Sequence, residues 1–162
     1  MRNNIIVLLF LACISHSCDE NRVFDDYKKV PNQWHKDSII KFNFKAPDTI
    51  STYNLFINIR NNKDYKFNNL FLIATLKFPH GKVVKDTLEY KMANEKGEFL
   101  GDGFSDIKEN KLWYKGHENP FKFEELGNHE ILLQHAMRES GKVNGVINLE
   151  GIADIGFRIE TP

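Results

Sequence analysis

Apolar and polar residues alternate along the chain from residue 40 onward. Over 40–46 every second residue is apolar, in the order Ile-Lys-Phe-Asn-Phe-Lys-Ala, and Pro47 ends the run. The same period of two returns over 53–60. A period of two places one face of a β-strand in a core and the other face in water. Both segments are therefore predicted to be half-buried strands.

A hairpin is predicted next. Residues 70–78 form a continuous apolar run that ends at the turn residues 79–81 (Pro-His-Gly), and an alternating segment follows over 83–92. A continuous run of this length is typical of a central strand that is covered on both faces. The glycine-containing stretch 93–110 is expected to be an irregular excursion. The other predicted strands are 112–115, 121–123, 129–137 and 155–159.

These segments amount to about eight strands, with turn signals between them and no helical period. The pattern predicts an all-β fold, a single-domain antiparallel β-sandwich over residues 39–162. The strand count and the long excursion favour a jelly-roll-like topology, and an Ig-like sandwich is the alternative. Residues 18–38 lack a sustained period and are expected to be an N-terminal tether.

The first residues carry a different pattern. A short basic start precedes 10 apolar residues (5–14), followed by Ser15-His16-Ser17 and Cys18. This predicts a secretory signal peptide at 1–17, because a bilayer core about 30 Å thick needs roughly 20 apolar residues to span it. A cysteine directly after small Ser17 is typical of a bacterial lipoprotein signal, with cleavage between Ser17 and Cys18 and a lipid on the Cys18 thiol. Cys13 after Ala12 is an alternative lipidation site, and an ordinary signal peptide with an incidental cysteine is another.

Charge and cysteine content further limit the partners and the kind of fold that we expect. The whole chain has 22 basic and 22 acidic residues, so removal of 1–17, which contain Arg2 and no acidic residue, leaves a net charge of −1. The two signs are interspersed, which argues against nucleic acid as a partner and against a polybasic membrane patch. If Cys18 carries lipid, the mature chain has no second cysteine for a disulfide, and the fold must depend on its hydrophobic core.

The residues that could carry chemistry form no recognisable site. His129 and His135 share a predicted strand face, but six positions in a strand separate them by roughly 20 Å, too far to hold one zinc ion. Asp102, Asp106 and Glu109 are a calcium candidate, although their spacing does not match the EF-hand loop. No nucleophile elbow, phosphate-binding loop or distinctive carboxylate pair is present. No catalytic residue, metal site or cofactor is predicted.

Aromatic residues suggest a contact surface. Trp113 and Tyr114 are adjacent near a strand end, so they must point to opposite faces and at most one of them is exposed. An exposed Trp113 would support a glycan-binding hypothesis. Met137 and Arg138 end the strand predicted over 129–137. Trp, Tyr, Met and Arg are enriched at interfaces, so these four residues are the candidate partner surface.

Several stretches match one known pattern in order and spacing: Cys18-Asp19-Glu20-Asn21-Arg22-Val23-Phe24, Phe42-Asn43-Phe44, Asp86-Thr87-Leu88, Gly97, Leu100-Gly101-Asp102-Gly103, Leu112-Trp113-Tyr114, Gln134-His135-Ala136-Met137-Arg138 and Leu149-Glu150-Gly151-Ile152-Ala153-Asp154-Ile155-Gly156. Through them the mature chain resembles the gliding motility lipoprotein GldH family of Bacteroidetes. Ser15 departs from the lipoprotein pattern, which usually has Leu at that position.

The resemblance implies a non-enzymatic cell-envelope lipoprotein that is needed for gliding motility. It implies work beside other gliding motility lipoproteins and the type IX secretion and motility machinery, and it supplies no catalytic residues. The expected location is the outer membrane, facing the periplasm, with the membrane contacted through the lipid on Cys18. A glycan-binding envelope lipoprotein is the alternative function, and a hydrolase is a third.

Overall fold

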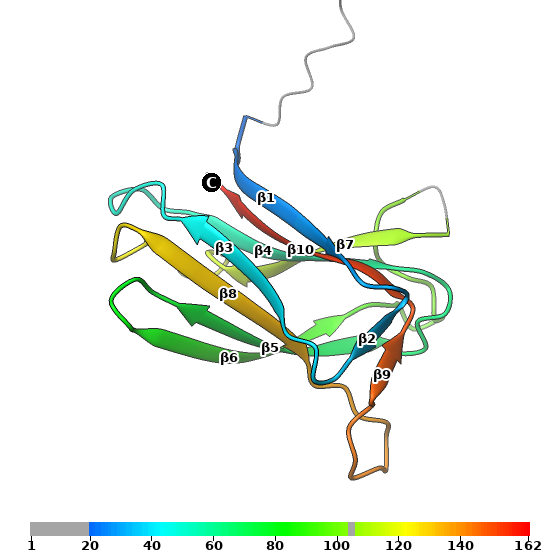
Figure 1. Ribbon diagram of the computed structural model, residues 1–162. Coiled ribbons are helices and arrows are strands. Elements are labelled where there is room, and N and C mark those ends of the chain that lie inside the picture. The colour runs from blue at the N-terminus through cyan, green and yellow to red at the C-terminus, as the bar shows by residue number, and fades with distance from the viewer. Residues whose placement is uncertain (1–19, 104–105) are drawn as a thin grey trace, which may run out of the picture.

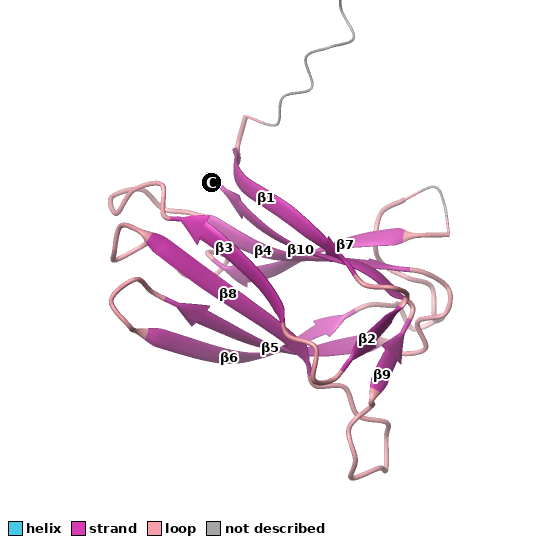
Figure 2. Ribbon diagram, in the orientation of Figure 1, coloured by secondary structure: helices cyan, strands magenta, loops and turns pink. Residues whose placement is uncertain are grey.

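The computed structural model describes residues 20–103 and 106–162. The predicted signal peptide, its cleavage point between Ser17 and Cys18, and the alternative Cys13 lie outside the described residues. The described part is built of strands and contains no helix (Figure 2). The strands are β1 (Arg22–Lys29), β2 (Gln33–His35), β3 (Ile40–Lys45), β4 (Asn54–Asn61), β5 (Asn69–Lys77), β6 (Val83–Lys91), β7 (Lys108–Lys115), β8 (Asn128–His135), β9 (Asn148–Glu150) and β10 (Ile152–Glu160).

The strands pair as one long antiparallel hairpin that is folded over on itself. From the centre of the chain outward, β5 pairs with β6, β4 with β7, β3 with β8, β2 with β9 and β1 with β10. Two further pairings, β10 with β4 and β5 with β8, join four of these pairs into two four-stranded sheets, and β2 with β9 remains a separate two-stranded sheet (Figure 1). We call the sheet β1-β10-β4-β7 sheet I and the sheet β3-β8-β5-β6 sheet II. This nested order is that of a jelly roll, so the predicted antiparallel β-sandwich is confirmed.

The core lies between the two sheets and follows the predicted period of two. Inward-facing apolar residues come from alternate positions of the central strands. The central strands that carry these inward-facing rows are β4 and β10 in sheet I, and β5 and β8 in sheet II. The fully buried side chains of these four strands include Leu55, Ile57, Ile59, Ile155, Phe157, Ile159, Leu70, Leu72, Leu76, Ile131 and Leu133.

The N-terminal part of the sandwich differs from the prediction. Residues 22–35, expected to belong to a tether, form β1 and β2, and β1 is an edge strand of sheet I. Trp34 in β2 is fully buried, and its indole N–H donates to the carbonyl oxygen of Ser38 at 2.8 Å. The sandwich therefore starts at Arg22 rather than at residue 39.

Two other segments also differ from the prediction. β5 was expected to be covered on both faces, but its burial alternates, and its outer positions such as Phe71 and Ile73 are only half-buried. Residues 121–123 were expected to form a strand. Instead, Phe121 forms a single isolated bridge with Tyr53, and Phe123 is buried with its ring edge-on to His129. This segment closes one end of the core rather than extending a sheet.

Candidate functional site

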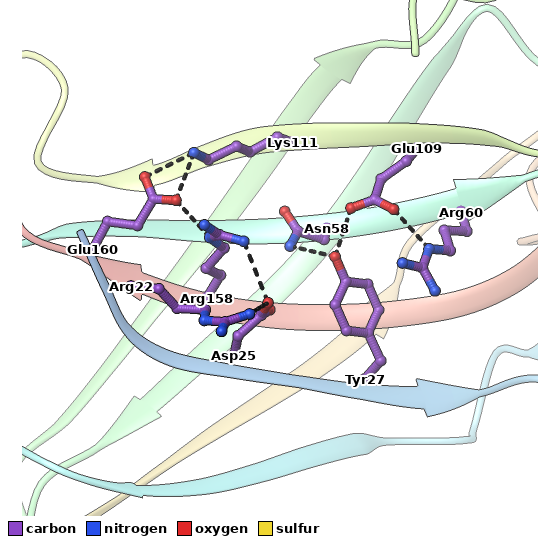
Figure 3. A network of polar contacts seen from close by, with 9 residues as sticks. All are labelled: Arg22, Asp25, Tyr27, Asn58, Arg60, Glu109, Lys111, Arg158 and Glu160. Carbon is purple, nitrogen blue, oxygen red and sulfur yellow. Dashed lines mark hydrogen bonds and ion pairs between the residues drawn. The ribbon is translucent and has the colours of Figure 1, made fainter. Parts of the chain in front are cut away.

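A network of polar side chains covers the outer face of sheet I, the face that points away from sheet II. It draws residues from all four strands of the sheet (Figure 3). In the part of the chain that the structure describes, no further layer of strands lies over this face (Figure 1). The members are Arg22, Asp25, Tyr27, Asn58, Arg60, Glu109, Lys111, Arg158 and Glu160.

One half of the network is centred on the Tyr27 hydroxyl. This hydroxyl donates to Glu109 Oε1 at 2.6 Å and accepts a hydrogen bond from Asn58 Nδ2 at 2.8 Å. Arg60 Nε donates to the other oxygen of Glu109 at 2.7 Å, and the guanidinium lies 4.3 Å from the centre of the Tyr27 ring. The ring lies against Gly156, its partner on β10, where a Cβ would come within 2.7 Å of a ring carbon. The missing side chain at Gly156 thus makes room for the tyrosine.

These contacts fix the protonation states. Burial alone would raise the pKa of Glu109, but the hydrogen bonds from Tyr27 and Arg60 outweigh it and hold that pKa below its usual value. Burial, followed by the hydrogen bond to Glu109, raises the pKa of Tyr27 well above its ordinary value. At neutral pH Glu109 is therefore an anion, and Tyr27 keeps its proton as a donor.

The other half of the network is a chain of ion pairs. Lys111 Nζ contacts both carboxylate oxygens of Glu160, at 2.8 and 2.7 Å. Glu160 also accepts from Arg158 Nε at 2.5 Å, and Arg158 Nη1 donates to Asp25 Oδ2 at 3.3 Å. Arg22 is the last member of this series of ion pairs, 3.9 Å from Asp25. Basic and acidic groups therefore alternate across the sheet from β7 to β1.

Two acceptor atoms in this network have no hydrogen-bond donor among the described residues. They are Asp25 Oδ1 and Asn58 Oδ1, and both are buried. Burial raises the pKa of Asp25, although the nearby Arg22 opposes the effect. Buried acceptors are normally satisfied by protein or by water. Both oxygens are covered by the fold, so the surface that a partner could contact consists of the neighbouring charged side chains, of which Arg60, Glu109 and Lys111 are 37%, 39% and 46% exposed.

An aromatic cluster continues the outer face along β4 and β7. The Trp113 ring packs on Phe56 with centroids 4.3 Å apart, and His117 stacks on Trp113 at 4.7 Å. Lys111 Nζ lies 4.2 Å from the centre of the Phe56 ring. Phe56 is buried beneath these neighbours, whereas Trp113 remains 38% exposed. A hollow of about 450 Å³, lined by residues 113–121, opens beside it.

The structure separates the four residues of the predicted partner surface. Trp113 lies on the outer face and Tyr114 on the inner side, as their adjacency requires; Tyr114 is buried, and its hydroxyl donates to Asp86 at 2.9 Å. Met137 is only 2% exposed, and its sulfur accepts from the backbone N–H of Phe71. Arg138 is exposed but follows β8 of sheet II, and it lines a different hollow from the one beside Trp113. Of the four residues, Trp113 is the one that lies beside the polar network, against Phe56.

The candidate metal ligands are committed to other contacts. His129 and His135 are both buried, and burial lowers the pKa of each imidazole. Glu109 from the calcium candidate is held by Tyr27 and Arg60, and its backbone pairs with Asp102. Within the described residues no group of three His, Cys, Asp or Glu side chains could hold a metal ion.

Sequence reasoning missed most of the network. Asn58 and Arg60 were visible as the polar half of the alternation over 53–60, which marks them as outward-facing. Asp25 and Tyr27 gave no signal, because β1 has no regular alternation. Pairing across strands in a sheet, rather than pattern within one strand, brings these residues together.

The fold and this outer face define an all-β jelly-roll module whose distinctive feature is a hydrogen-bonded, exposed sheet surface. Along the described ranges, 20–103 and 106–162, no helix is long and apolar enough to cross a bilayer. The chain belongs to the GldH lipoprotein family, whose model matches residues 22–159. The match begins at the first residue of β1 and ends one residue before the end of β10, so it covers nearly the whole sandwich.

Curated relatives are similar over nearly their full length. A protein of Christiangramia forsetii named gliding motility lipoprotein GldH homolog is 51% identical over 157 residues, which cover 97% of this chain and 94% of that protein. The gliding motility lipoprotein GldH of Flavobacterium johnsoniae is 51% identical over 154 residues, covering 95% and 94%. Among solved structures, the infectious bursal disease virus VP2 subviral particle matches 88% of this chain and 33% of its own, with 16% identity and a TM-score of 0.37. A structural similarity this distant supports no further conclusion.

Proposed function

We propose that this protein is a cell-envelope lipoprotein required for gliding motility, and that it acts as a non-enzymatic assembly or stabilising component. The observation that carries the proposal is the 51% identity, over 95% of the chain, to a protein named gliding motility lipoprotein GldH. A lipid on Cys18, which becomes the N-terminus after cleavage behind Ser17, holds the domain at the outer membrane, facing the periplasm. Its partners are other gliding motility lipoproteins and the type IX secretion and motility machinery.

The outer face of sheet I is the surface that we propose for a protein partner. It combines a partly exposed Trp113 with the partly exposed charged side chains of Arg60, Glu109 and Lys111. Tryptophan and arginine are enriched at interface hot spots. Arg138 lies elsewhere, and Met137 and Tyr114 are buried, so the proposed surface now depends on Trp113 and the network.

The anchor and the surface need separate tests. Cys18→Ala should abolish both metabolic fatty-acid labelling and gliding, whereas Cys13→Ala should keep both. Labelling that persists in Cys18→Ala would move the acylation site to Cys13. For the surface, Trp113→Ala should reduce co-purification of other gliding motility lipoproteins from envelope extracts. Val143→Ala is the matched control, because Val143 is also an exposed apolar residue but lies in the loop between β8 and β9.

A glycan-binding function would use the same tryptophan. Sugars stack on an open aromatic face, and in this structure His117 already stacks on the indole of Trp113. Polysaccharide binding would therefore require His117 to move aside. Binding that is retained by Trp113→Ala would rule out this role, and co-purification of partners without any polysaccharide affinity would favour the assembly role.

A further inference from the structure

One end of the sandwich carries the start of β1 and the end of the chain. In sheet I, Arg22 pairs with Glu160, and Glu160 pairs with Asn54 at the start of β4. In sheet II, Lys45 at the end of β3 pairs with Asn128 at the start of β8. The loop 46–53 joins these two sheets at the same end. We call this the near end; its loops are 46–53, 79–82 and 116–127.

Loop 46–53 holds an isoleucine in solvent. Asp48 Oδ1 accepts hydrogen bonds from the backbone N–H groups of Ile50 and Ser51, at 2.8 and 2.6 Å. Asp48 Oδ2 accepts from the Tyr53 hydroxyl at 2.6 Å, and these bonds lower the pKa of Asp48. The loop is therefore internally braced, yet Ile50 at its tip is 81% exposed. An apolar side chain held out in this way gains from any apolar environment that covers it.

A second exposed apolar side chain lies at the same end. Leu126 is 62% exposed and precedes Gly127, which lies against Pro79 of the neighbouring turn. Glu125 accepts from the backbone N–H of His80 at 2.8 Å and so ties the two loops together. Two side-chain contacts also join these loops: His80 Nδ1 lies 3.1 Å from Glu125, and Lys82 Nζ lies 2.5 Å from Glu124.

Exposure alone does not select this end, because the far end exposes apolar residues as well, such as Val143 (85%). The length of chain before β1 selects it. Arg22 follows Cys18 by four positions along the sequence, and this stretch spans at most about 14 Å when fully extended. Strands of nine residues such as β10 are about 30 Å long, so the far end lies well beyond that reach.

We infer that the near end of the sandwich sits on the lipid surface that holds the anchor, with Ile50 and Leu126 entering the membrane interface. The inference rests on the proposed acylation of Cys18. Because the three loops of the near end contain two lysines and four acidic residues, the contact depends on apolar side chains and does not require anionic lipid. The exposed face of sheet I then stands beside the membrane rather than against it, free for a partner.

Single thiols test the orientation. The sequence contains 2 cysteines, Cys13 in the signal peptide and Cys18 under the lipid, so Ile50→Cys gives the mature acylated protein one reactive thiol. Leu126→Cys gives a second probe position, and Val143→Cys is the control, with nearly the same exposure as Ile50 but at the far end. Each protein is labelled with an environment-sensitive fluorophore and reconstituted into phosphatidylethanolamine vesicles that contain brominated lipid.

The expected result is flotation of all three proteins with the vesicles, and several-fold stronger quenching at 50 and 126 than at 143. Flotation with equal quenching at the three positions would overturn the inference while leaving the anchor intact. Proteins that fail to float, with an unmodified N-terminus by mass spectrometry, would refute the anchor and the orientation together. A thiol at position 50 that is shielded from labelling in native envelopes, but not in vesicles that lack other proteins, would also overturn the inference. That result would assign the near end to a protein partner.

Discussion

Gly151, between β9 and β10, has a backbone and surroundings that no other residue should tolerate. Its φ of +83° lies in the region that side chains disfavour, and a Cβ built there would be 2.1 Å from the backbone nitrogen of Tyr65. The neighbouring loop cannot withdraw freely, because Asn62 donates its N–H to the Gly151 carbonyl at 2.9 Å. The Gly151 N–H in turn donates to the carbonyl of Asn32 at 2.9 Å.

The loss of folding free energy expected for Gly151→Ala has two parts, and substitutions at two other glycines measure each part separately. A positive φ costs a non-glycine residue about 1–2 kcal/mol, and overpacking typically adds about 1–3 kcal/mol. Gly141→Ala should show the first part alone, because its φ is +76° but nothing lies within 4 Å of its Cβ. Gly156→Ala should show the second alone, through the Tyr27 ring. Gly151→Ala should therefore lose about 2–5 kcal/mol, a large share of the roughly 5–15 kcal/mol of a typical domain.

Urea unfolding of the purified proteins, followed by tryptophan fluorescence, measures these differences, because Trp34 is fully buried in the folded protein. The slope of the free energy of unfolding against urea should stay constant across the series, so that midpoints can be compared directly. If Gly151→Ala is no less stable than Gly141→Ala, the close approach of Tyr65 has no energetic consequence and the reasoning fails.

Two further predictions concern buried polar groups. Tyr27→Phe should destabilise the protein by about 1–3 kcal/mol, because Asn58 loses its acceptor in a buried position. The same substitution should raise the pKa of Glu109, which NMR can follow. An unchanged Glu109 titration would show that the Tyr27 hydroxyl does not lower that pKa. Burial lowers the pKa values of His129 and His135 in the folded state. Their contribution to the free energy of unfolding is therefore fully present above about pH 6.5 and is lost below it, as the unfolded chain takes up protons. The loss is at most about 1.4 kcal/mol per pH unit for each histidine. His129→Phe should flatten the dependence of the free energy of unfolding on pH between 7 and 5, and an unaltered slope would contradict this cause.

The strands that the sequence predicts well are those whose two faces differ. β3 and β4 alternate because one face of each strand packs against the opposite sheet and the other face contacts water or the polar network. β1 was missed because it is an edge strand: Asp26 and Lys28 share the inward side with Phe24, opposite Phe157 and Ile155 of β10. An edge strand tolerates charges at such positions, so its composition looks like that of a tether.

The candidate surface shows the same limit from another direction. The prediction that Trp113 and Tyr114 point to opposite faces was correct, because it used strand geometry. Met137 was placed on the surface by its residue type, yet it continues the period-two row that contains Ile131 and Leu133, both fully buried. Periodicity was the better guide there. The network itself joins β1 to β7 across the sheet, and no pattern within a single segment encodes that arrangement.

The nested pairing of the strands has a consequence for how the molecule is made. Contacts at the β5–β6 hairpin are local, whereas the pairing of Arg22 with Glu160 spans almost the whole described chain. Folds dominated by such non-local contacts have a high contact order and fold slowly. β10, the last strand to be synthesised, lies between β1 and β4 and is the only strand that joins them within sheet I. The sandwich therefore cannot close before β10 has been synthesised, and a truncation that removes β10 would remove the strand with which β1 pairs.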